Sequence, residues 1–84
     1  MGLEILVADD EALIRLGLRA MLEEMGHQVT LATDGREALR LARQRAFDLA
    51  IFDIKMPLTD GLQAAQTLSR TAPLPIIFLT AYSQ

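Results

Sequence analysis

The sequence predicts a single α/β domain in which helices flank a parallel β-sheet. Four short apolar runs alternate with three amphipathic segments over the 84 residues, an alternation that is typical of consecutive β-α-β units. Apolar residues make up 51% of the chain, as in ordinary globular domains. No linker, repeat or low-complexity segment divides the sequence, so we expect one domain over residues 1–84.

The four apolar runs are predicted to be strands. The first run, residues 3–8, and the third, residues 48–52, are both followed by acidic residues. The second covers residues 28–32, and the fourth, residues 75–79, begins at a proline. The first run, which is short, apolar and closed by acids, has the pattern of a buried strand.

The three segments between these runs have helical periodicity. Residues 11–25 place apolar side chains three and four positions apart, and a glycine follows. Residues 34–45 begin with Asp and Glu three positions apart, the pattern of a helix capping box, and residues 60–70 begin similarly with Asp60 and Gln63. The stripe of the first helix that we expect to face the sheet consists of Ile14, Leu18, Met21, Leu22 and Met25.

The strand order follows from general rules of α/β topology. Right-handed crossovers and helices on both faces favour a winding that reverses once, which gives the strand order 2-1-3-4. Ligands of such sheets bind at the carboxyl ends of the strands where the winding reverses, here between the first and third strands. Asp9 and Asp10 follow the first strand and Asp53 follows the third. Because adjacent strands lie about 4.8 Å apart, we expect these three carboxylates to converge.

Three converging carboxylates repel one another unless a proton or a cation neutralises them. Hard oxygen ligands without cysteine or histidine nearby favour Mg²⁺ or Mn²⁺. Magnesium commonly binds one or two carboxylates together with phosphate oxygens, which indicates phosphoryl chemistry. Any one of these acids alone would be an ordinary turn or helix-capping residue, but their convergence predicts a divalent-cation site.

Five short motifs, in order along the chain, resemble those of the receiver domains of two-component response regulators. They are Asp9-Asp10, Asp53, Lys55-Met56-Pro57, Asp60-Gly61 and Thr80-Ala81. The resemblance covers the whole chain and implies a flavodoxin-like, doubly wound, three-layer fold. It also implies phosphorelay signal transduction, in which a sensor histidine kinase or a phosphotransfer protein donates a phosphoryl group.

The resemblance implies a role for individual residues. Asp53 is expected to accept the phosphoryl group and to form an aspartyl phosphate. Asp10 and Asp53 are expected to bind Mg²⁺ or Mn²⁺ directly, Asp9 mainly through a water molecule, and Lys55 through its backbone carbonyl. Such a domain catalyses its own phosphorylation and is not an enzyme that turns over a separate substrate.

The resemblance places two further groups at the phosphoryl oxygens, the hydroxyl of Thr80 and the amide of Ala81. Receiver domains continue with a helix, a fifth strand and a last helix, and the family's invariant lysine follows that fifth strand. The chain stops four residues after Thr80, so we expect a receiver truncated after its fourth strand and slowly phosphorylated. We also expect self-association through the uncovered flank of the first helix and the edge of the fourth strand.

Composition excludes several other classes of function. The absence of cysteine excludes a disulfide framework, a thiol nucleophile and a thiolate zinc site. A net charge of −3 and a pI near 4.9 disfavour direct binding to nucleic acid or to an anionic membrane. Asp9 and Asp10 interrupt the first apolar run, which fits neither a signal peptide nor a membrane span, and we expect a cytoplasmic protein.

Two other functions stay open from the residues alone. An interaction or scaffold domain of receiver ancestry would keep the acids without being phosphorylated, and a phosphodonor assay distinguishes it. An aspartate-nucleophile phosphatase also combines an α/β sheet with magnesium. Its nucleophile normally begins an Asp-x-Asp pattern after the first strand, whereas Asp9 and Asp10 are adjacent and Asp53 is followed by Ile54 and Lys55.

Overall fold

The computed structural model describes residues 2–54, 61–71 and 74–79. Its elements alternate between strand and helix, in the order that the sequence predicts. They are β1 (Glu4–Ala8), α1 (Ala12–Glu24), β2 (Gln28–Ala32), α2 (Gly35–Gln44), β3 (Leu49–Asp53), α3 (Gly61–Thr71) and β4 (Ile76–Leu79). One boundary changes the description of the site, because Asp53 is the last residue of β3 and not the first residue after it.

The four strands form one parallel sheet with the order β2-β1-β3-β4. Leu6 of the central strand β1 lies opposite Thr30 on β2 and opposite Ala50 on β3. On the other side of β3, Asp53 pairs with Leu79 of β4. The predicted order is confirmed, and the winding reverses between β1 and β3 as expected.

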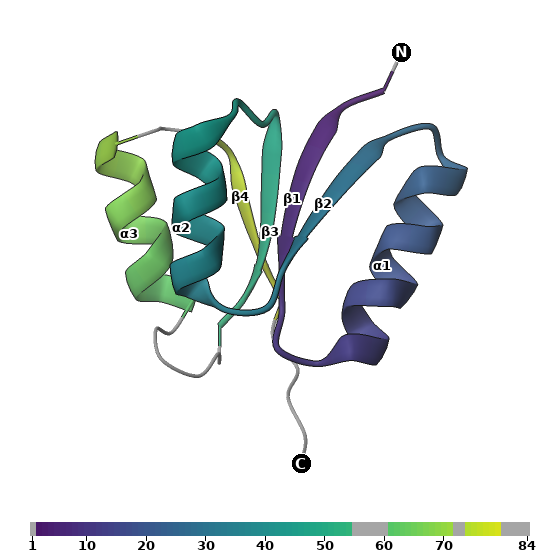
Figure 1. Cartoon of the computed structure of the whole chain (residues 1–84), viewed down its shortest axis with the longest axis horizontal. Helices are drawn as coiled ribbons and strands as arrows, with labels where there is room; N and C mark the ends of the chain where they lie inside the picture. Colours follow the sequence, from purple (N-terminus) through teal and green to yellow (C-terminus); the bar gives the residue numbers. More distant parts are fainter. Residues whose placement is uncertain (1, 55–60, 72–73, 80–84) are drawn as a thin grey trace.

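Helices cover both faces of the sheet, with α1 on one face and α2 and α3 side by side on the other (Figure 1). Successive residues of a strand therefore enter two different apolar clusters. Leu6 and Phe52 pack with residues of α2 and α3, whereas Ile5 and Val7 pack with Leu22 of α1. Within the described part of the chain, no helix is long and apolar enough to cross a membrane.

The end of α1 is fixed by backbone hydrogen bonds around Gly26. The N–H of Gly26 donates to the oxygen of Glu23, and the N–H of His27 donates to the oxygen of Leu22, each at 3.0 Å. These are the two hydrogen bonds of a Schellman motif. The motif needs a residue with positive φ, and Gly26 has a φ of 98°. The glycine therefore ends the helix where the sequence predicts.

The predicted sheet-facing stripe of α1 is only partly buried, which corrects the expectation from the sequence. Leu22 is buried, and Ile14 and Leu18 are half-buried. The main contacts of this helix with the sheet are with β2 and β1, so the sheet underlies only part of its apolar arc. The side chains left exposed, which we term the α1 apolar face, are Leu13 (86% exposed), Leu16 (48%), Met21 (50%) and Met25 (64%).

Asp34 caps the N-terminus of α2, as its spacing from Glu37 predicts. Its Oδ1 accepts a hydrogen bond of 2.8 Å from the N–H of Glu37. The side chain of Glu37 turns back toward the N-terminus, but its Oε1 accepts from the N–H of Thr33, at 2.7 Å. The arrangement is therefore a capping box displaced by one residue. The corresponding start of α3 at Asp60 lies outside the described residues.

Candidate metal centre

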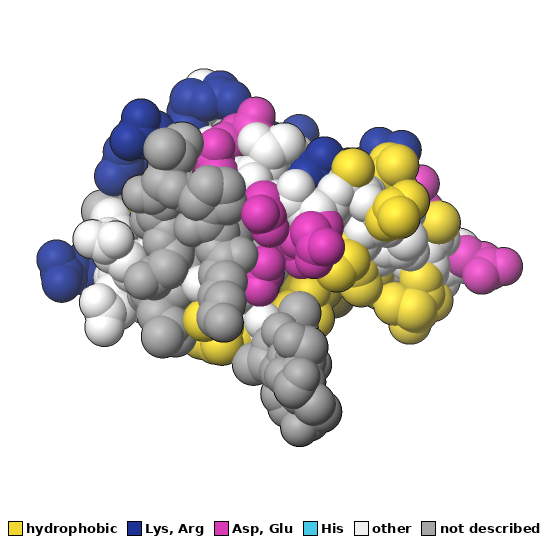
Figure 2. All heavy atoms as spheres, turned by 90° about the horizontal axis from the view of Figure 1, so that it is seen from below, with side chains coloured by type: hydrophobic (Ala, Val, Ile, Leu, Met, Phe, Trp, Pro, Cys, Tyr) yellow, Lys and Arg dark blue, Asp and Glu magenta, His cyan; other side chains and the backbone are white. Residues whose placement is uncertain are grey.

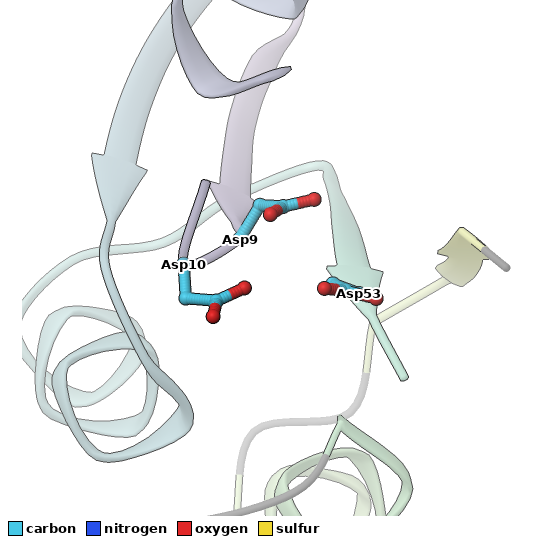
Figure 3. Close-up of side chains that lie close together, drawn as sticks. All are labelled: Asp9, Asp10 and Asp53. Atoms are coloured by element: carbon cyan, nitrogen blue, oxygen red, sulfur yellow. The ribbon is translucent and has the colours of Figure 1, made fainter. Parts of the chain in front are cut away.

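Three carboxylates meet at the carboxyl ends of β1 and β3. Asp9 and Asp10 directly follow β1, and Asp53 ends β3. One ligand oxygen from each side chain lies within 4.8 Å of the other two. Figure 3 shows the three side chains pointing into a common space. The convergence that the strand order predicts is thus confirmed.

The cluster is partly withdrawn from water. Asp9 is 1% exposed and Asp53 is 5% exposed, whereas Asp10 is exposed. In the space-filling view from the carboxyl ends of the strands, acidic side chains gather near the middle of the surface, with hydrophobic side chains on the side of α1 (Figure 2). A ligand can therefore reach the cluster from this face of the molecule.

Asp9 is held by hydrogen bonds at its backbone and at its side chain. Its N–H donates to the oxygen of Ala32 at 3.2 Å. Its Oδ1 accepts from the N–H of Glu11 at 2.9 Å, and its backbone oxygen accepts from Nη1 of Arg15 at 2.8 Å. The turn between β1 and α1 is consequently restrained on both sides of the acidic pair.

Burial and like charges raise the pKa of the Asp9 carboxyl above its ordinary value. Desolvation is the largest cause, and the charges of Asp53, Asp10 and Glu11 add to it. The hydrogen bond from the N–H of Glu11 acts in the opposite direction. Bringing these acids together therefore costs free energy, which a bound cation would offset.

The donor set fits a hard divalent cation. Its members are carboxylate oxygens alone, and the chain contains no cysteine. Such oxygens suit Mg²⁺ and Mn²⁺ better than softer metals. Among the described residues, no other group of histidine and acidic side chains has this geometry.

Several residues that the resemblance assigns to the site lie outside the described residues. These are Lys55, Thr80 and Ala81, together with the motif residues Met56, Pro57 and Asp60. Conversely, the contacts of Glu11 and Arg15 with Asp9 were not predicted from the sequence. The position of Arg15 in the first turn of α1 is the signal that could have identified it, because helical side chains point back toward the N-terminus.

Over residues 5–84 the sequence matches the family model of the response regulator receiver domain. The chain belongs to the response regulator receiver family. Its function is that of a receiver domain in phosphorelay signalling, as the motifs indicate. Its fold is accordingly the flavodoxin-like fold expected for this family.

Curated relatives of this receiver domain are named as regulators. It is 47% identical over 81 residues to the transcriptional regulatory protein PdtaR of Mycobacterium tuberculosis, covering 95% of the chain and 40% of PdtaR. It is 40% identical over 77 residues to the transcriptional regulatory protein AfsQ1 of Streptomyces coelicolor, covering 92% of the chain and 34% of AfsQ1. The receiver domain thus spans less than half the length of either relative.

Solved structures share its fold. The response regulator TrrA of Thermotoga maritima, solved in complex with Mg²⁺ and BeF, has a TM-score of 0.92 and 42% identity over 99% of the chain and 72% of TrrA. The chemotaxis protein CheY4 of Vibrio cholerae has a TM-score of 0.92 and 31% identity over 100% of the chain and 72% of CheY4.

Proposed function

We propose that this receiver domain accepts a phosphoryl group on Asp53 in a reaction that depends on a divalent cation. The observation that carries the proposal is the meeting of Asp53, at the end of β3, with the pair Asp9 and Asp10 within 4.8 Å. The phosphodonor is a sensor histidine kinase or a phosphotransfer protein, and we place the reaction in the cytoplasm. Membership of the receiver family supports this proposal.

Asp10 and Asp53 bind Mg²⁺ directly, Asp9 binds it mainly through water, and the backbone carbonyl of Lys55 is a further ligand. The exposure of Asp10 is consistent with a direct ligand that an entering cation can reach. The complex of TrrA with Mg²⁺ and BeF supports Mg²⁺ as the cation, and Mn²⁺ has similarly hard ligand preferences. When bound, the cation offsets the repulsion between the carboxylates and the entering phosphoryl group.

A carboxylate oxygen of Asp53 attacks the phosphorus atom of a phosphohistidine. The new O–P bond forms as the P–N bond breaks, and the released imidazole nitrogen takes a proton from solvent. The hydroxyl of Thr80 and the amide of Ala81 donate hydrogen bonds to the phosphoryl oxygens. Since positioning and charge neutralisation supply most of the catalysis in phosphoryl transfer, the domain catalyses its own phosphorylation without turning over a separate substrate.

Intact-mass spectrometry after incubation with acetyl phosphate and Mg²⁺ tests the assignment of Asp53. We expect the wild-type chain to gain one phosphoryl group and Asp53→Asn to gain none. Asp48→Asn is the matched control, because Asp48 precedes the same strand at the opposite end of the sheet. Modification of Asp53→Asn would refute the assignment, and an unmodified wild type would favour the interaction or scaffold domain.

Titration with Mg²⁺, followed by amide NMR shifts, tests the ligand assignment separately. Asp10→Ala should lose most of the affinity, because it removes a direct carboxylate ligand from the cluster. Glu24→Ala removes an acidic side chain at the far end of α1 and should leave the affinity unchanged. Unaltered binding in Asp10→Ala would show that Asp10 is not a ligand.

A further inference from the structure

Arg15 lies in the first turn of α1, and its side chain returns to the acidic cluster. Its Nη1 donates a hydrogen bond of 2.8 Å to the backbone oxygen of Asp9. The side chain is half-buried, and the backbone N–H of Arg15 donates to the oxygen of Glu11 as part of the regular helix. The guanidinium is thus fixed between the helix and the turn that carries the acids.

The oxygen that Arg15 contacts belongs to the peptide group that joins Asp9 to Asp10. Because this peptide group is planar, its orientation sets the directions in which both residues project their side chains. The N–H of Glu11 donates to the side chain of Asp9, and the N–H of Asp9 donates to the oxygen of Ala32. Both the side chain and the N–H of Asp9 are therefore restrained. The bond from Arg15 adds a restraint on the carbonyl that lies between the two acids.

We propose that Arg15 is a positioning residue for the cation site. It orients the peptide between Asp9 and Asp10 so that both carboxylates face Asp53, without itself contacting the cation. This inference rests on the proposed function, since it presupposes that the cluster binds Mg²⁺. Groups that hold metal ligands in place typically change the metal affinity by about 10–100-fold when they are removed.

The sign of the effect distinguishes positioning from charge. Arg15 is cationic, so by electrostatics alone its removal should tighten the binding of a cation. If Arg15 instead holds the peptide in place, its removal should weaken binding in spite of the lost repulsion. For Arg15→Met, which keeps an apolar stem but removes the donor and the charge, we expect about tenfold weaker Mg²⁺ binding.

The matched control is Arg19→Met, one helical turn further along α1. Arg19 is exposed, and its replacement changes the net charge of the chain by the same amount. We expect its Mg²⁺ dissociation constant to equal that of the wild type or to fall slightly. Both constants are measured on the full 84-residue chain at fixed ionic strength, from amide NMR shifts that also report whether each variant is folded.

The outcomes separate this inference from the proposed function. A wild-type chain that does not bind Mg²⁺ refutes the cation site itself. If the wild type binds Mg²⁺ but Arg15→Met binds it equally or more tightly, then Arg15 does not position the ligands. The same conclusion follows if Arg19→Met loses as much Mg²⁺ affinity as Arg15→Met. A purely structural role would lower the free energy of unfolding but leave the dissociation constant of the folded chain unchanged. Should Arg15→Met not fold, Arg15→Leu, which also lacks the donor and the charge, replaces it with the same expectation.

Discussion

Replacement of Asp9 by asparagine should stabilise the metal-free chain at neutral pH. Asp9 is 1% exposed, and one of its oxygens lies within 4.8 Å of ligand oxygens of Asp10 and Asp53. Asparagine has nearly the same shape and keeps an oxygen that can accept the hydrogen bond from the N–H of Glu11. The substitution therefore removes mainly the charge.

The size of the stabilisation can be worked out from the geometry of the cluster. Two like charges 4.8 Å apart repel by about 1 kcal/mol in water and by about 3.5 kcal/mol at an effective dielectric constant of about 20. The repulsion between Asp9 and the exposed Asp10 should be close to the value in water. The repulsion between Asp9 and the buried Asp53 should lie between the two values. Weakening of the charge-assisted hydrogen bond from Glu11 offsets about 1 kcal/mol. A net gain of about 1–2 kcal/mol is expected.

The pH dependence follows from the raised pKa of Asp9, whose causes are burial first and then the neighbouring negative charges. A carboxyl with a raised pKa in the folded state favours folding while it is protonated. This contribution is complete below its unfolded-state pKa and is lost as the pH rises through the folded-state pKa. The asparagine side chain of the variant stays neutral at every pH. The free energies of unfolding should therefore converge in acid and diverge toward neutral pH.

Urea unfolding followed by circular dichroism, with a chelator present, measures this difference at acidic and neutral pH. Asp48→Asn is the matched control, because Oδ2 of Asp48 also accepts a backbone hydrogen bond, of 2.8 Å from the N–H of Glu4, but outside the cluster. We expect no stabilisation from that substitution. The reasoning is refuted if Asp9→Asn is no more stable than the wild type at neutral pH, or if its advantage persists undiminished in acid.

Four further expectations concern stability and association. Gly17→Ala should raise the free energy of urea unfolding by about 0.5–1 kcal/mol, because an added Cβ meets no atom within 4 Å; a loss would contradict the open environment. Asp34→Ala should lower it by about 1 kcal/mol through loss of the α2 cap, and no change would show that the cap is dispensable. Phe52→Ala should cost about 3–5 kcal/mol in the same assay, since Phe52 is 0% exposed, and a small loss would indicate that the core refills. In sedimentation equilibrium the 84-residue chain should form dimers through the α1 apolar face and β4, and a monomer at every concentration would refute this.

The fold was predictable because the apolar runs in the sequence identify the strands and a general topology rule then limits their order. Continuous apolar runs such as that around Leu6 indicate strands buried on both faces, and the structure divides Ile5 and Leu6 between the two sides of the sheet. Crossover handedness then leaves few strand orders. The boundary of β3 was less predictable, because Asp53 belongs to the strand by its pairing with Leu79 and not by its polarity.

The extent of burial on α1 could not be predicted from periodicity. The spacing of Leu18, Leu22 and Met25 shows which side of the helix is apolar, but it does not show how much of the sheet lies beneath. In the structure, α1 packs on β2 and β1, so Leu22 is buried while Met25 remains 64% exposed. Burial here depends on the lateral position of the helix, which is a tertiary property.

The acids of the site were predictable from strand ends alone, whereas the contacts that hold them were not. The hydrogen bond from Arg15 to Asp9 depends on the path of a long side chain, which sequence spacing does not determine. Charge and geometry at this site can nevertheless be separated by two substitutions. Asp9→Asn should weaken cation binding, because it removes one of the negative charges that attract the cation. It should stabilise the metal-free chain, because the same charge is repelled by the neighbouring acids. Arg15→Met should weaken cation binding without that stabilisation, because it leaves the three acidic side chains in place and removes the hydrogen bond that orients two of them.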